Sequence, residues 1–273
     1  MGMDRWAGKR IGFIGAGRMA EALIRGVVSA GALRPEAIQA YDVDAGRLQT
    51  LAAELGIVPA AGNAEAARGA DLVVLATKPR VAPAALEQAR PGLAAGQTVV
   101  SLAAGVKIAD LVALLPEGVG LVRVMPNTPC QVGAGMTVLA ANSPATPEGM
   151  ALAQALFDCC GETELLPESA FDAVTALSGS GPAYVFLLIE AMADGGVQAG
   201  LPREAAQRLA VQTALGAAAL VARSGRHPAQ LRDMVASPGG TTIAALAALE
   251  AGGVRAAVMQ AVMAAARRSA ELG

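Results

Sequence analysis

The clearest chemistry-bearing pattern in the sequence is a pair of glycines that follows a short apolar run. Gly15, Gly17 and Ala20 fit the spacing G-x-G-x-x-G/A directly after the apolar residues 11–14. In this pattern the first glycine allows a tight turn, the second lets the backbone approach a pyrophosphate, and the third position lets a helix pack closely on a strand. The start of that helix offers free N–H groups to phosphate oxygens. The spacing therefore predicts a dinucleotide site.

Charged residues after two later apolar runs fit the same site. Asp42 lies about 20 residues beyond the glycines, where an acid accepts hydrogen bonds from a ribose 2′-hydroxyl and repels a 2′-phosphate, which favours NADH over NADPH. Arg18 and Arg47 offset this charge, and a role of Asp42 as a turn or helix-capping residue is an equal alternative. Lys78, within Ala76–Pro79, is expected to meet the cofactor or an anionic substrate.

Two glycine-rich turns in the second half, Leu177–Tyr184 and Ser237–Thr242, each separate two predicted helices. Such turns offer unpaired N–H groups beside small hydroxyl side chains, so they can bind a carboxylate or serve only as helix caps. Neither turn has a neighbouring histidine or carboxylate pair for acid–base catalysis. Reduction of a C=N bond fits this better, because a protonated imine mainly needs positioning, with Thr242 hydrogen-bonded to its nitrogen.

The elements that must position these residues alternate in the first half. Short continuous apolar runs between helical stretches indicate a parallel sheet covered on both faces, a doubly wound α/β fold of Rossmann type. The predicted strands are Ile11–Gly15, Ile38–Asp42, Asp71–Ala76, Thr98–Leu102 and Leu121–Met125, and the helices are Met19–Ala30 and Ala45–Leu55.

Strand character ends near Leu165 or Leu166, and the remaining sequence is almost wholly helical. We therefore predict a dinucleotide-binding domain over residues 1–166 and an all-α domain over residues 167–273. The expected helices are Ser169–Leu177, Pro182–Ala199, Pro202–Ser224, Pro228–Val235, Thr241–Ala251 and Val254–Leu272. Residues 183–193 and 209–222 lack a convincing polar face, so a partner subunit is expected to cover them.

Composition excludes several classes of function. The net charge of −2 and 3% aromatic content give no reason to expect a nucleic-acid partner. One histidine, His227, and three cysteines without zinc spacing argue against a metal site, and His227 is expected at a helix boundary. No signal peptide is recognised, and the apolar stretches are broken by charges, proline or glycine, so we expect a cytoplasmic protein with no membrane partner.

Taken together, the motifs resemble those of the pyrroline-5-carboxylate reductase family over nearly the whole chain. Residues 11–20 resemble its opening strand and glycine loop, residues 76–79 its A-x-K-P element, and residues 123–129 its R-x-M-P-N-T-P element. Residues 172–184 and 235–242 resemble its two helical signatures, which are far more specific than the glycine loop. One departure is Tyr41-Asp42, where some members carry Ser or Arg; this puts the usual NADPH preference in doubt.

The resemblance implies reduction of 1-pyrroline-5-carboxylate, a small cyclic imine, to L-proline with NADPH or NADH, and a homodimer formed through the helical domain and able to assemble further. It adds Asn63, Ala103 and Ala104 to the cofactor site. The predicted cofactor residues are then Ile14, Gly15, Ala16, Gly17, Arg18, Met19, Asp42, Asn63, Ala76, Thr77, Lys78, Pro79, Ala103 and Ala104. The implied substrate residues are Glu168, Ser178, Gly179, Ser180, Gly181, Gly239, Gly240 and Thr241, with Thr242 as the catalytic residue nearest the imine nitrogen.

Two other classes of protein share parts of this pattern. A β-hydroxyacid-dehydrogenase-like reductase shares the architecture but uses a lysine in its helical half as an acid, and residues 167–273 contain no lysine. A nucleotide sensor that kept the fold without turnover is the second, since a fold does not imply a function. Both glycine-rich turns are intact, which favours an enzyme.

Overall fold

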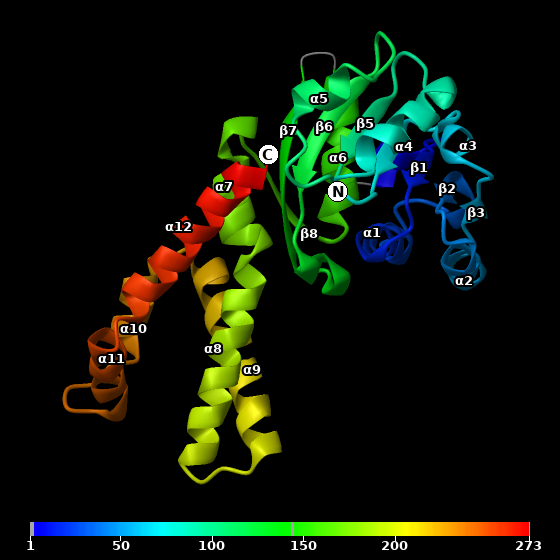
Figure 1. Ribbon diagram of the computed structural model, residues 1–273. Helices are drawn as coiled ribbons and strands as arrows, with labels where there is room; N and C mark the ends of the chain where they lie inside the picture. The colour runs from blue at the N-terminus through cyan, green and yellow to red at the C-terminus, as the bar shows by residue number, and fades with distance from the viewer. Residues whose placement is uncertain (1–2, 143–144, 273) are drawn as a thin grey trace. The chain divides into compact units, whose positions relative to one another are not determined.

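The computed structural model describes residues 3–142 and 145–272, which contain an eight-stranded sheet (Figure 1). Its strand order is β3-β2-β1-β4-β5-β6-β7-β8, and all neighbours are parallel except β6 and β7. The strands are β1 Ile11–Ile14, β2 Ile38–Tyr41, β3 Val58–Pro59, β4 Leu72–Leu75, β5 Thr98–Ser101, β6 Gly120–Met125, β7 Gly135–Ala141 and β8 Gly161–Leu165. The order reverses between β1 and β4, which is where doubly wound sheets bind ligands.

The five predicted strands are confirmed, each end within one residue of its expected place. The antiparallel pairing of β6 with β7 departs from the expectation of a parallel sheet. Its cause is the short connection between Met125 and Gly135, since a parallel return needs a crossover of a dozen or more residues. The longer connection through α6 makes β7 and β8 parallel again.

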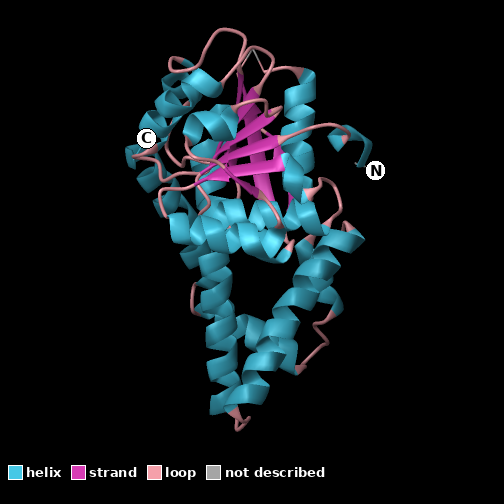
Figure 2. Cartoon of the chain, turned by 90° about the vertical axis from the view of Figure 1, so that its right-hand side faces the viewer, coloured by secondary structure: helices cyan, strands magenta, loops and turns pink. Residues whose placement is uncertain are grey.

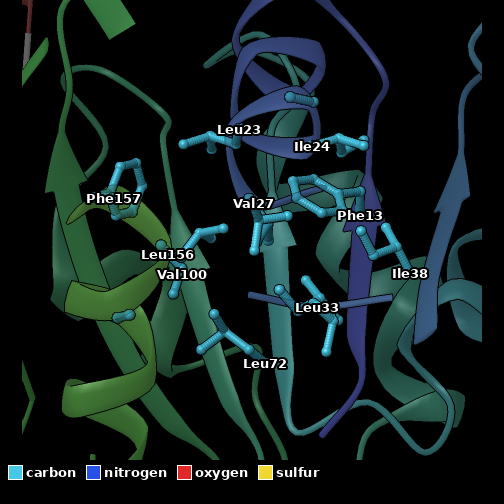
Figure 3. Packing of buried hydrophobic residues seen from close by; sticks show 14 of the residues in the cluster. Phe13, Leu23, Ile24, Val27, Leu33, Ile38, Leu72, Val100, Leu156 and Phe157 are labelled. Carbon is cyan, nitrogen blue, oxygen red and sulfur yellow. The ribbon is translucent and has the colours of Figure 1, made fainter. Parts of the chain in front are cut away.

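Helices cover both faces of the sheet (Figure 2). They are α1 Arg18–Ser29, α2 Ala45–Leu55, α3 Asn63–Ala67, α4 Ala82–Ala89, α5 Ile108–Val112 and α6 Pro147–Asp158, with 3-10 turns at Met3–Trp6, Pro35–Ala37, Arg90–Gly92, Thr128–Val132 and Glu168–Ala170. Side chains alternate between the faces along each strand. Phe13 of β1 packs with Leu23 of α1 and Leu156 of α6 on one face (Figure 3), whereas Ile14 packs with α4 on the other.

The helical region continues from Glu168 through α7 Phe171–Val174 and a π-helical turn, Thr175–Gly179, into α8. The remaining helices are α8 Gly181–Gln198, α9 Arg203–Ser224, α10 Pro228–Met234, α11 Thr241–Ala251 and α12 Val254–Leu272. The chain divides into two compact units, residues 1–179 with 265–273, and residues 180–264. In the second unit α8 and α9 lie side by side (Figure 1), joined by a turn in which Gly200 has φ +100°.

The second unit exposes most of its apolar side chains. Among residues 180–264, all of which are described, only Ala193, Ala206, Ala210 and Leu231 are buried. Phe186 on α8 is 62% exposed. By length and composition, residues 168–198 and 203–224 are apolar enough to cross a membrane, and α11 with α12 passes the same test as a pair bent by 50°. The expectation that charges, proline or glycine break every apolar stretch was therefore wrong. Helical structure continues through Thr175–Pro182, where the sequence suggested a break, and residues 205–222 contain a single charged residue, Arg208.

Candidate active site

Parallel register gathers the predicted cofactor loops at one edge of the sheet. Ile14 at the end of β1 pairs with Tyr41 of β2 on one side and Leu75 of β4 on the other. Leu75 pairs in turn with Ser101 at the end of β5. The loops that begin at Gly15, Asp42, Ala76 and Leu102 therefore leave the sheet side by side.

The two glycines of the first loop differ in what surrounds them. Gly15 has φ +97°, and a Cβ built there would lie 2.9 Å from the carbonyl oxygen of Ala76. Gly17 is the N-cap of α1 with φ −69° and ψ −179°, and a Cβ there would meet only Nη1 of Arg47, at 3.9 Å. No side chain caps this end of α1, so its first N–H groups have no side-chain acceptor, and Gly15 and Gly17 line an open space. The local geometry thus leaves room for an anion where the motif predicts one.

That space is a cleft of about 430 Å³ at the switch point between β1 and β4. Half of the predicted cofactor residues line it: Gly15, Gly17, Asp42, Asn63, Ala76, Thr77 and Lys78. The other lining residues are Tyr41, Val43, Arg47, Val81, Ala84, Ala85 and Gln88, of which the sequence pointed only to Tyr41 and Arg47, as neighbours of Asp42. Val81, Ala84, Ala85 and Gln88 lie at or in α4, which is not among the helices predicted from the sequence.

The remaining predicted cofactor residues lie outside the cleft lining. Ile14 at the end of β1 and Ala16 within the glycine loop are both buried, and Met19 packs against the core. Arg18 is exposed and lines a separate hollow with Glu21, Arg25 and Gln131, while Pro79 is exposed after Lys78. Ala103 is buried and Ala104 exposed, directly after β5 at the same edge of the sheet.

Asp42 ties the glycine loop to the next turn. Its Oδ2 accepts a hydrogen bond from Ala16 N at 2.6 Å, and its Oδ1 accepts one from Asp44 N at 2.8 Å. Asp44 then caps α2 by accepting from Arg47 N at 3.0 Å. The turn role of Asp42 is therefore present in the structure. Each carboxylate oxygen has a further lone pair for a ribose hydroxyl, so the two roles are compatible.

Polar groups inside the cleft are partly unpartnered. Thr77 Oγ1 is buried and has no hydrogen-bond partner among the described residues. Asn63 is buried, and its Nδ2 donates to Gln88 Oε1 at 2.8 Å, which fixes both amides at the wall. A buried hydroxyl without a partner is costly unless a ligand or water satisfies it. The cleft therefore has the polar features of a binding site.

Glu168 is held in a second cluster within the first unit. Its Oε1 accepts from Ile108 N at 2.7 Å and from Arg123 Nη1 at 2.8 Å. Arg123 is 8% exposed and lies over the Phe171 ring, 4.7 Å from its centroid. Together with Lys107 these residues border a cavity of about 310 Å³. Glu168, at the start of the helical region, is thus tied to β6 and α5, and it lines a different cavity from the predicted cofactor residues.

Of the other predicted substrate residues, Ser178 and Gly179 lie in the π-helical turn, and the rest lie at or beside the starts of α8 and α11. Ser180 is the N-cap of α8 and Gly240 the N-cap of α11, and neither start has a side-chain cap. Within the second unit the start of α8 and the start of α11 lie well apart (Figure 1). The starts of these two helices therefore do not meet within this unit. His227 caps α10 by accepting from Ala229 N at 3.2 Å, as its expected boundary role requires.

Two family models match the chain. One, described as pyrroline-5-carboxylate reductase dimerisation, matches residues 168–272. The other, described as NADP oxidoreductase, coenzyme F420-dependent, matches residues 10–105. These two ranges contain the helical region and the glycine loop with its cleft, respectively.

Relatives match over almost the full length. The pyrroline-5-carboxylate reductase of Methanosarcina acetivorans is 45% identical, over 97% of this chain and 98% of its own. The solved structure of a pyrroline-5-carboxylate reductase from Coxiella burnetii superposes with a TM-score of 0.92 at 36% identity, over 97% and 98% of the two chains. The Plasmodium falciparum pyrroline carboxylate reductase, solved with NADP bound, superposes with a TM-score of 0.86 at 34% identity, over 97% of this chain and 98% of its own. This chain belongs to the pyrroline-5-carboxylate reductase family.

Proposed function

We propose that the protein reduces 1-pyrroline-5-carboxylate to L-proline with a hydride from NADPH or NADH. The observation that carries the proposal is the cleft at the β1–β4 switch point in a chain similar to these reductases from end to end. The fold itself is shared with many other dehydrogenases, so the family relationship supplies the reaction.

The described residues fit a dinucleotide. Gly17 presents backbone rather than side chain to the cleft, the start of α1 is uncapped, and Thr77 Oγ1 lacks a partner. The pyrophosphate would lie on the loop of Gly15 and Gly17, since N–H groups at a helix start attract anions. A bound reduced nicotinamide supplies the hydride. Ala103 and Ala104 follow β5 at the same edge and would flank the ring.

Cofactor preference depends on the wall formed by Tyr41, Asp42 and Arg47. The charge of Asp42 lies in the cleft and opposes a 2′-phosphate, which favours NADH. Arg47 lines the same cleft and has no ion-pair partner among the described residues, so it moderates this preference. We propose that both cofactors are used and that NADH is favoured.

The substrate pocket would be formed by the two glycine-rich turns. The uncapped starts of α8 and α11 can each bind a carboxylate through N–H groups. Because these starts lie apart in one chain, we infer that a second copy brings its α11 turn to the first chain's Ser178–Gly181 segment. Thr242, in the first turn of α11, would hydrogen-bond the imine nitrogen. The matched dimerisation model agrees with such a pairing.

The same second copy would cover the exposed apolar faces of α8 and α9. Phe186 and Leu187 are 62% and 65% exposed, and a soluble chain hides such a surface in an interface. We propose a homodimer in the cytoplasm, able to assemble further, without nucleic-acid or membrane partners. A dimer in sedimentation without detergent would support this, and a detergent-dependent monomer would count against it.

The reaction is tested by following loss of the reduced-nicotinamide absorbance after addition of 1-pyrroline-5-carboxylate, with NADH and with NADPH in separate runs. We expect loss with both and formation of one proline per dinucleotide oxidised. A protein that binds NADH, as measured by calorimetry, but oxidises none with this imine would be a sensor rather than a reductase. A protein active only on other cyclic imines would correct the substrate.

A further inference from the structure

One side chain links the sheet edge to the helical signature and has no role in the site described above. Asn127 follows β6, and its Oδ1 accepts a hydrogen bond from Met136 N at 2.9 Å. Its Nδ2 donates to Ser178 O at 3.2 Å and to Ser178 Oγ at 3.3 Å. These partners fix the orientation of the amide, because Met136 N can only donate and the Ser178 carbonyl can only accept.

The segment held by Asn127 departs from regular α-helix. Thr175–Gly179 forms a π-helical turn between α7 and α8, a feature that is rare and frequent at functional sites. The end of β6 also packs there, because a Cβ on Gly179 would lie only 2.6 Å from Met125 Cε. The loop after β6 therefore fixes the backbone of Ser178 and Gly179 by hydrogen bonds and by close contact.

The position of this link places it near the chemistry. β6 is parallel to β5, and Ser101 at the end of β5 pairs with Arg123 of β6. Asn127 thus leaves the sheet at the same edge as the glycine loop and the Ala103–Ala104 segment. All of these residues belong to the first compact unit.

The direction of the hydrogen bonds determines what Ser178 can offer to a ligand. Its Oγ accepts from Asn127 Nδ2, so its hydroxyl proton is left to donate elsewhere. Ser178 is half-buried, and an O–H donor there suits an anionic oxygen. We propose that Asn127 is a positioning residue that holds the Ser178 hydroxyl as a donor toward the substrate carboxylate. This inference rests on the proposed function.

The test uses the full-length protein and the isosteric variant Asn127→Asp. The aspartate keeps an acceptor for Met136 N but presents oxygen to Ser178, whose hydroxyl then donates to the aspartate instead of the substrate. We expect KM for 1-pyrroline-5-carboxylate to rise roughly ten- to hundredfold, the range for losing a hydrogen bond to a charged group. We expect kcat to fall less than about threefold and the NADPH dissociation constant to stay within about twofold.

A second variant separates this effect from added charge or poor folding. Ser178→Ala removes only the hydroxyl, and we expect a similar rise in KM. The KM of the double variant should be little higher than that of either single variant, because both substitutions remove the same interaction. Asn142→Asp is the matched control. In the wild-type protein Asn142 Oδ1 accepts a hydrogen bond from Leu121 N at 2.8 Å, near the opposite end of β6, and Asn142 Nδ2 has no partner among the described residues.

Wild-type turnover is measured first, and its absence would remove the proposed function together with this inference. With wild-type turnover present, a KM within about twofold of wild type in folded Ser178→Ala or Asn127→Asp would overturn the inference alone. An equal rise in KM for Asn142→Asp would also overturn it, because the effect would then come from general loosening of β6.

Discussion

Replacement of Gly17 by valine should strongly weaken dinucleotide binding while leaving the fold intact. The N-cap position of Gly17 has extended backbone angles that any residue adopts, and the added Cβ meets only Arg47, at 3.9 Å. Valine caps a helix less well than glycine, so we expect a loss of unfolding free energy of about 1 kcal/mol or less. The fold should therefore survive.

Binding should suffer far more, because the new side chain occupies the space of the pyrophosphate. A carbon atom keeps about 3.5 Å from its neighbours, whereas a hydrogen-bonded phosphate oxygen lies about 2.9 Å from a backbone nitrogen. Displacing the phosphates would cost two charge-assisted hydrogen bonds of about 1.5–3 kcal/mol each. The summed loss of binding free energy, about 3–6 kcal/mol, corresponds to a dissociation constant that is roughly 10²- to 10⁴-fold larger.

Isothermal titration with NADH and with NADPH measures this loss, and thermal unfolding measures the fold. Gly62→Val is the matched control, because Gly62 is also a helix N-cap in extended conformation, has nothing within 4 Å of an added Cβ, and does not line the cleft. A folded Gly17→Val protein with an NADH affinity within about threefold of wild type would refute the assignment of the pyrophosphate to this loop.

Three further predictions follow from other positions. Gly15→Ala should lower the unfolding free energy in urea by about 2–4 kcal/mol, since a side chain at φ +97° is strained and its Cβ approaches Ala76 O; unchanged stability would contradict this. Asp42→Asn should tighten NADPH binding relative to NADH by about three- to tenfold by removing a negative charge, and an unchanged ratio would exclude Asp42 from cofactor choice. Burial raises the pKa of the Cys160 thiol to about 12 from an ordinary value of 9.0, so stability should fall as pH rises from about 9 to about 12, because only the unfolded chain then loses the proton. Replacing Cys160 with alanine should flatten that slope by up to about 1.4 kcal/mol per pH unit, and an identical slope would contradict the buried-thiol account.

The sequence was informative wherever one local rule controls the structure. Continuous apolar runs placed β1, β2, β4, β5 and β6 to within one residue, because strands buried on both faces admit few polar side chains. The glycine spacing placed the turn at Gly15 because only glycine adopts its φ of +97° without strain.

Other features depend on contacts that a single segment does not encode. The short helices α3 and α5 and the two-residue strand β3 contain too few residues to show a repeating pattern of apolar side chains. The π-helical turn at Thr175–Gly179 accepts a hydrogen bond from Asn127, which is remote in sequence, and α4 follows β4, which pairs with β1 across a long stretch of sequence. The domain boundary at residues 166 and 167 stays a prediction: the dimerisation model begins at Glu168, whereas the compact units divide at Gly179.

Thr242 stays a prediction as well, and its test is kinetic. Thr242→Ala should lower kcat more than it weakens NADPH binding, because the lost hydroxyl orients the imine rather than the dinucleotide. Thr242→Ser keeps the hydroxyl and should recover most of the turnover. Wild-type kcat in the alanine variant would remove Thr242 from the mechanism.

The most direct test of the central claim follows the transferred hydrogen itself. The protein is supplied with 1-pyrroline-5-carboxylate and a dinucleotide deuterated at the reactive nicotinamide carbon, using both deuterated epimers in separate runs. We predict that one epimer yields L-proline carrying a single deuterium on the former imine carbon, seen by mass spectrometry and NMR. Direct hydride transfer to the imine would be contradicted if neither epimer gave deuterated proline, or if a protein that binds the dinucleotide formed no proline.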